Sequence, residues 1–115
     1  MLLRTSWFAV LLALAGSPAA SDTLTFEQGQ QLARQKVCLG CHQVEKKRVG
    51  PAFVDVADRY ASGGEASIDY LVLSIRNGGR GRWGAIPMPA QTQVSEQEAR
   101  SLATWILGLQ TKSTN

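Results

Sequence analysis

Residues 37–43 read VCLGCHQ, and this stretch holds both cysteines and the only histidine of the 115-residue chain. A disulfide between Cys38 and Cys41 would close a very short loop, which stabilises a fold little, and it would leave His42 without a role. A thioredoxin-like redox pair needs a preceding strand and a βαβ frame, whereas the residues before Cys38 have a helical pattern. Zinc needs four ligands in a structural site or three in a catalytic one, and the chain offers no further cysteine or histidine.

The spacing C-x-x-C-H is the attachment signature of c-type haem. In that arrangement two cysteine sulfurs bond to the vinyl groups of the porphyrin, and the adjacent imidazole lies under the iron. We therefore predict that Cys38 and Cys41 attach one haem c covalently and that His42 is an axial iron ligand. A disulfide or redox pair and a zinc site are the alternatives.

A second stretch supplies a candidate for the other side of the iron. Residues 83–90 read WGAIPMPA, and Pro87 and Pro89 exclude a helix interior and a central strand around Met88. A methionine is usually a flexible gap-filler in a core. Here the prolines fix the backbone and leave the thioether free, and Met88 is the only methionine after the leader described next. We predict that Met88 is the second axial ligand.

The N-terminus has the layout of a secretory signal peptide. Arg4 precedes an apolar run over residues 7–15, and small residues follow. The run is shorter than the roughly 20 residues of a transmembrane helix, so an uncleaved membrane anchor is the weaker alternative. The sequence predicts a signal peptide over residues 1–20, cleaved within about two residues of that point, and a soluble, periplasmic mature domain over residues 21–115.

Composition narrows the class of protein. The formal net charge is +3, which is too mild for a nucleic-acid-binding domain. The length allows one domain. A domain this small buries a modest core and commonly needs a covalent crosslink or a bound cofactor for stability. The haem would provide this stabilisation.

Helical periodicity covers most of the remaining chain. No run alternates with period two, so a sheet is not expected, and the fold class is all-α. Capping boxes are expected at Thr25 with Gln28 and at Ser95 with Glu98, Pro51 is expected in a first turn, and Ser67 is expected as an N-cap. The four predicted helical segments are residues 25–38, 51–64, 67–79 and 95–109.

Each segment carries an apolar face that should point inward. The third segment should end at Gly78. The predicted inward residues are Phe26, Ala33, Val37, Phe53, Val56, Ala57, Tyr60, Leu71, Leu73, Ile75, Leu102, Trp105, Ile106 and Leu109.

The segments CLGCH, VGPAF, NGGRGRWGAIPMPA and LATWILGL together resemble those of the small bacterial monohaem cytochromes c of class I. The resemblance runs from Gly29 to Leu109. It implies a cytochrome c fold, in which four helices and a methionine-bearing loop wrap around one covalently bound haem. It also implies axial ligation by His42 and Met88 and a role in donating electrons to nitrite reductases or terminal oxidases.

The resemblance assigns supporting roles to three further residues. Pro51 matches a proline whose carbonyl accepts the ring N–H of the ligating histidine, which fixes its tautomer. Trp83 matches a tryptophan whose indole N–H reaches a haem propionate. Gly29 matches a small residue where the first and last helices cross, with Trp105 in the same core.

Two positions depart from the pattern of these relatives. Ser74 stands where several of them carry an arginine that holds a propionate, which leaves open whether Arg76, Arg80 or Arg82 takes that role. Gln91 stands where relatives often carry an asparagine that bonds the methionine sulfur.

The predicted function is that of a soluble periplasmic electron carrier, because His/Met ligation raises the potential of a haem and fills the position that a substrate would need. No separate catalytic constellation is present in the sequence, so an enzyme is not expected. The expected partners are redox proteins, namely an electron donor and a terminal reductase or oxidase, with no nucleic acid and no small-molecule substrate, and the protein should be a monomer. The alternatives are a haem subunit of a periplasmic dehydrogenase and a gas sensor or peroxidase.

Overall fold

The computed structural model describes residues 15–16 and 23–111. Apart from Ala15 and Gly16, the predicted signal peptide of residues 1–20 lies outside the described residues, and so does its cleavage point. Within the described ranges, no helix is both long enough and apolar enough to span a membrane.

Four α-helices and two short 3₁₀ helices are found among the described residues, and the predicted all-α class is confirmed. In the described part of the chain, the only β-type pairing is an isolated bridge between Gly79 and Met88. The elements are α1 (Phe26–Gln35), η1 (Cys38–Gly40), α2 (Phe53–Tyr60), η2 (Ala61–Gly63), α3 (Glu65–Asn77) and α4 (Glu96–Leu107).

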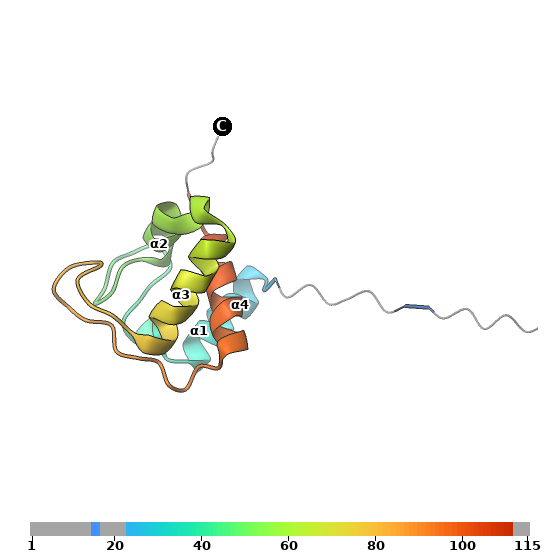
Figure 1. The fold of residues 1–115 in the computed structure, drawn as a ribbon, viewed down its shortest axis with the longest axis horizontal. Helices are drawn as coiled ribbons and strands as arrows, with labels where there is room; N and C mark the ends of the chain where they lie inside the picture. Colours follow the sequence, from blue (N-terminus) through green and yellow to red (C-terminus); the bar gives the residue numbers. More distant parts are fainter. Residues whose placement is uncertain (1–14, 17–22, 112–115) are drawn as a thin grey trace, which may run out of the picture.

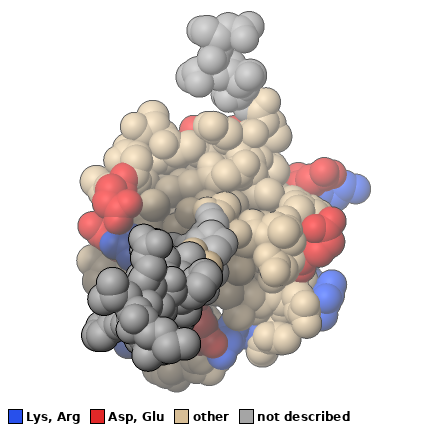
Figure 2. Space-filling view, turned by 90° about the vertical axis from the view of Figure 1, so that its right-hand side faces the viewer, with Lys and Arg blue, Asp and Glu red and all other residues tan. Residues whose placement is uncertain are grey.

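Helix α4 is the centre of the packing, because it contacts α1, α2 and α3. Figure 1 shows α3 and α4 side by side, with the long connection between them sweeping out to the left of the helices. Figure 2 views the molecule from the side opposite to that connection, and there acidic and basic side chains lie around a largely uncharged surface.

The two predicted capping boxes are confirmed. At α1, the backbone N–H of Gln28 donates to Thr25 Oγ1 (3.2 Å) and the Thr25 N–H donates to Gln28 Oε1 (2.9 Å). Ser95 and Glu98 make the same reciprocal pair at the start of α4, at 2.9 and 3.1 Å. The predicted end of α3 is also confirmed, because Gly78 caps it with φ 68°.

The predicted start of α2 is wrong. The helix begins at Phe53 rather than at Pro51. The N–H groups of Phe53 and Val54 donate to the carbonyl oxygens of Gln43 and Val44, at 2.9 and 3.0 Å. The preceding loop therefore satisfies the free donors at the helix start, and Pro51 stays outside the helix.

The predicted start of α3 is also wrong. The helix begins at Glu65, and its N-cap is Gly64, whose φ of 57° is unusual for other residues. Ser67 is buried inside the first turn rather than capping it, and a Cβ on Gly63 would overlap its hydroxyl. The turn geometry of the glycine pair sets this boundary.

Most predicted inward residues lie in the core, and Tyr60 and Leu109 pack partly buried against it. The exceptions are Phe26, Val37 and Leu73, with 45%, 67% and 60% of their surface exposed. Leu73 lies two residues from both Leu71 and Ile75, which places it on the opposite side of the helix.

The crossing of α1 and α4 depends on a glycine. A Cβ on Gly29 would overlap the indole of Trp105. The Trp105 ring in turn meets Phe53 edge-on, with 5.7 Å between ring centroids, and Phe26 at 6.2 Å. The close approach predicted at Gly29 is therefore confirmed.

Candidate functional site

One cavity of about 360 Å³ lies between the segment before α2, the inner faces of α2, α3 and α4, and the connection from α3 to α4. Its wall is mostly apolar, with Val56, Leu71, Ile75 and Leu102 from the three helices. The structure brings all six predicted cofactor-binding residues to this cavity: Cys38, Cys41, His42, Pro51, Trp83 and Met88.

The His42 imidazole is fixed by the backbone around it. Its Nδ1 lies 2.8 Å from the carbonyl oxygen of Pro51, and because a carbonyl only accepts, Nδ1 carries the proton. The ring stacks on Phe53, with centroids 5.1 Å apart and planes at 20°. Nε2 therefore keeps its lone pair for a metal.

Gly50 lies against the other side of this imidazole. A Cβ at Gly50 would stand 2.8 Å from His42 Nδ1 and 3.0 Å from Nε2. The Gly50 N–H donates to the carbonyl oxygen of Cys41 at 2.8 Å, so its backbone has little freedom to withdraw. Sequence reasoning missed this residue, because a glycine next to a proline signals only a turn.

The two cysteines are free thiols in the structure, with no disulfide between them. The N–H groups of Cys41 and His42 both donate to the Cys38 carbonyl oxygen, at 3.2 and 3.0 Å. This tight turn places both sulfurs and the imidazole at one wall of the cavity. Burial raises the pKa of the Cys38 thiol, although a backbone hydrogen bond opposes the effect.

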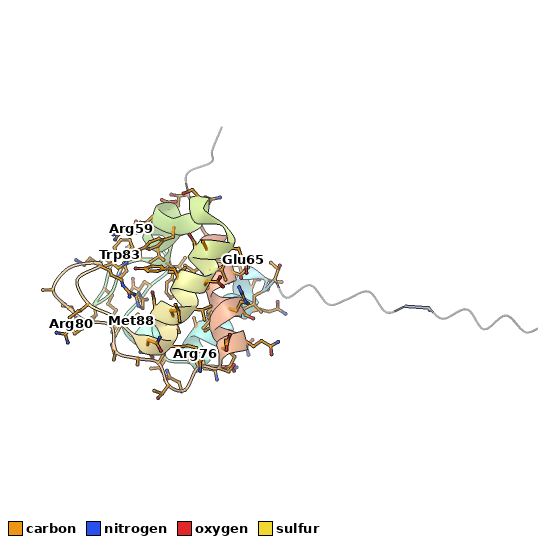
Figure 3. The ribbon with its side chains drawn as sticks, in the orientation of Figure 1. Arg59, Glu65, Arg76, Arg80, Trp83 and Met88 are labelled. Carbon is orange, nitrogen blue, oxygen red and sulfur yellow. The ribbon has the colours of Figure 1, made fainter. Side chains whose placement is uncertain are left out.

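Met88 is held by the end of α3. Its N–H donates to the Gly79 carbonyl oxygen (2.8 Å), and its own carbonyl oxygen accepts from the Gly79 N–H (3.0 Å). The Gln91 N–H donates to the Ile75 carbonyl oxygen at 2.9 Å. We call residues 79–91 the methionine loop; backbone hydrogen bonds close it at its base, and Figure 3 shows Met88 beside α3.

The amide of Gln91 has partners within the methionine loop and next to it. Its Nε2 donates to the Pro89 carbonyl oxygen, and its Oε1 accepts from Gln93, both at 2.8 Å. Gln91 thus lines the cavity with its amide bound to neighbouring residues.

Trp83 stands against α2. The Arg59 guanidinium lies 4.5 Å from its ring centroid, and Tyr60 meets it edge-on at 6.3 Å. Figure 3 shows Arg59 and Trp83 together at the α2 end of the site. Sequence reasoning missed Arg59, because its place beside Tyr60 does not reveal that it reaches a distant loop.

The charged side chains on the cavity wall are basic. Arg80 and Arg82 line it, and among the described residues no aspartate or glutamate does. Arg76 is outside the lining and pairs with Glu96 at 3.7 Å. Apolar walls, two thiols, an imidazole with a free lone pair and arginines fit a haem, which is a flat apolar macrocycle that bears two carboxylates.

Comparisons with known proteins agree with this geometry. The sequence profile described as "Cytochrome c" matches residues 26–110. The chain is 50% identical over 80 residues to cytochrome c-552 of Hydrogenobacter thermophilus, which covers 70% of this chain and 80% of the relative. It is 41% identical over 110 residues to cytochrome c-552 of Nitrosomonas europaea, which covers 93% of this chain and 99% of the relative.

The fold agrees as well. The crystal structure of Nitrosomonas europaea cytochrome c552 superimposes with a TM-score of 0.67 at 44% identity, over 70% of this chain and 99% of that one. The cofactor is a covalently bound haem c at the motif of Cys38, Cys41 and His42. The chain therefore belongs to the cytochrome c family, among its small class I monohaem electron carriers.

Proposed function

We propose that this protein is a soluble periplasmic shuttle that carries one electron at a time between a donor protein and a terminal reductase or oxidase. Its haem iron is ligated by His42 and Met88. The observation that carries the proposal is that both residues reach one cavity and that backbone hydrogen bonds hold each of them.

The imidazole of His42 is oriented for its role by its neighbours. The Nδ1 N–H donates a hydrogen bond to the Pro51 carbonyl oxygen, which leaves Nε2 as the coordinating atom and raises its basicity. The stack on Phe53 and the contact with Gly50 limit rotation of the ring. A ligand that is fixed in this way keeps its geometry in both oxidation states of the iron.

The methionine is prepared differently. Its side chain is flexible, but the N–H and the carbonyl oxygen of Met88 both form hydrogen bonds with the Gly79 backbone. Pro87 and Pro89 restrict the backbone on either side of Met88. The haem supplies an iron that alternates between ferric and ferrous states, and a thioether ligand favours the ferrous state.

Electron transfer rather than catalysis follows from this ligand set. With His42 and Met88 on the two faces of the haem, neither axial position is open to a substrate. The thiols of Cys38 and Cys41 are used in attachment, and no carboxylate among the described residues lines the cavity to act as an acid or base. This ligand set therefore supports an electron carrier rather than an enzyme.

The test is the holoprotein of Met88→Ala. We expect the haem to stay attached, the red absorption band of a sulfur–iron bond to vanish from the ferric spectrum, and the midpoint potential to fall by on the order of 0.1 V, since axial ligands tune haem potentials over about 0.8 V. Imidazole should also bind the vacated position. Ala85→Ser, an exposed change in the same loop outside the cavity lining, is the matched control and should keep the parent spectrum. If Met88→Ala keeps the band and the potential, Met88 is not the ligand.

A further inference from the structure

The Arg82 side chain is anchored to α3 although it comes from the methionine loop. Its Nη1 donates to the Ser74 hydroxyl oxygen at 2.6 Å, and that hydroxyl donates to the Tyr70 carbonyl oxygen at 2.8 Å. The guanidinium also lies 5.0 Å from the centroid of the Tyr70 ring. Two contacts therefore hold this cation at the wall of the cavity, and the Ser74 hydroxyl that makes one of them is itself fixed to the Tyr70 backbone.

A second arginine fixes the backbone at the same place. Arg59 Nη1 donates to the Arg82 carbonyl oxygen at 2.7 Å, while the same guanidinium stacks on Trp83. The methionine loop is thereby clamped between α2 and α3 at residues 82 and 83. Figure 3 shows Arg59 at this clamp and Arg80 at the outer edge of the loop.

The Arg82 charge has no acidic partner within the described part of the chain. The ion pairs there join Lys36 with Glu98, Arg76 with Glu96, and Arg100 with Glu65 and Asp69. A guanidinium has five N–H donors in a planar fork, and the Ser74 hydroxyl accepts from only one of its nitrogens. Carboxylates match this fork with two parallel hydrogen bonds.

The covalently bound haem brings two propionate carboxylates. We propose that Arg82, oriented by Ser74 and Tyr70, is the arginine that binds a haem propionate, and that Arg59 positions the segment that carries it. The hydroxyl at position 74 thus orients a guanidinium that arrives from the neighbouring loop. The inference rests on the covalent haem alone, so it stands or falls independently of Met88 ligation and of the carrier role.

Arg82 should keep the propionate ionised at low pH, because a nearby cation lowers the pKa of a carboxyl group. Reduction adds a negative charge to the haem, so the propionate pKa is higher in the ferrous state. The midpoint potential therefore falls with rising pH only between the ferric and ferrous values of that pKa. In the parent protein, this pH range, which we call the pH window, lies below neutral pH.

The other charged and titratable groups on this wall do not produce such a window near neutrality. The other arginine on this wall is Arg80. Burial raises the pKa of Tyr60, with the neighbouring Tyr70 adding to the effect, so Tyr60 stays neutral there. The propionate is the group whose titration the potential reports.

The experiment measures midpoint potential against pH for holoproteins of Arg82→Gln, Arg80→Gln and Arg76→Gln. Arg82→Gln should move the pH window upward by about 1 to 3 pH, while the other two variants keep the parent window. Arg82→Lys, which retains the charge and loses the fork, should restore most of the parent behaviour. The proposal is overturned if Arg82→Gln leaves the window in place, or if Arg80→Gln moves it instead.

Ser74→Ala provides an independent test that leaves every charge in place. It removes the hydroxyl that orients Arg82, so the window should move upward by less than in Arg82→Gln. This readout also serves if Arg82→Gln yields too little holoprotein. An unchanged window in Ser74→Ala would remove the positioning role of the hydroxyl.

Discussion

Gly78→Ala should loosen the methionine loop. Gly78 has φ 68° and ψ −167°, a backbone region that is essentially restricted to glycine, and strain there costs about 1–3 kcal/mol. A Cβ would also stand 2.7 Å from the Ala90 nitrogen and 2.9 Å from the Pro89 carbonyl carbon, and it would overlap the Met88 carbonyl oxygen. These are backbone atoms, so the loop itself must shift.

The expected magnitude combines both effects. Overpacking costs typically about 1–3 kcal/mol, so Gly78→Ala should lose about 2–6 kcal/mol in total, a large part of the 5–15 kcal/mol that is typical of a domain. Gly81→Ala is the matched control, because Gly81 has φ 78° and a Cβ there would meet no atom within 4 Å. It should lose the strain contribution alone.

Two measurements on the ferric holoprotein separate the contributions. Urea unfolding gives the stability difference between the two variants. Imidazole titration, followed by loss of the red band, reports how easily the loop releases the iron. Since 1.4 kcal/mol corresponds to a factor of ten, an overpacking cost of about 1–3 kcal/mol should make Gly78→Ala bind imidazole about 5- to 100-fold more tightly than Gly81→Ala. Equal imidazole affinities would show that the collision with the loop has no consequence, and the reasoning would fail.

Two further predictions concern the histidine side and the last helix. Gly50→Ala places a methyl group against the His42 ring, so it should lower stability by about 1–3 kcal/mol and perturb the ferric spectrum. In Gly40→Ala the new Cβ makes only an ordinary contact at 3.7 Å, so urea unfolding and absorption should show the stability and the spectrum of the parent. The capping bond from the Ser95 backbone and the neighbouring Lys36 hold the pKa of Glu98 below its usual value. The contribution of Glu98 to stability is therefore complete above the ordinary carboxyl pKa and is lost as the pH falls through the lowered pKa. Urea midpoints should fall less steeply in acid for Glu98→Gln than for the parent, and parallel curves would contradict the assignment.

Local signals in the sequence predicted local structure well. The capping boxes at Thr25 and Ser95 are correct because each needs only residues within one turn. Pro51 and Ser67 fail as helix starts for the opposite reason. The loop carbonyls before α2 and the glycine turn before α3 decide those boundaries, and neither is encoded in the propensity of the residue itself.

In the candidate site, too, contiguous motifs could be predicted from the sequence, and contacts between distant segments could not. The motif around His42 and the prolines around Met88 are contiguous, so the sequence indicates both, and the structure brings them to one cavity. The choice among the arginines is not contiguous. Arg82 is distinguished by a hydroxyl on α3 and a guanidinium on α2, and only the three-dimensional arrangement shows these contacts.

The contact of Gly29 with Trp105 has a consequence for the order of assembly during synthesis. It joins α1 and α4, so its formation closes the segment between Gly29 and Trp105 into one loop and carries the entropic cost of that closure. A nascent chain that has not yet delivered Trp105 cannot complete this core, although Cys38 and Cys41 have already emerged. Attachment of the haem to such a chain would shorten the remaining search, because the porphyrin would offer an apolar surface around which the later helices can collect.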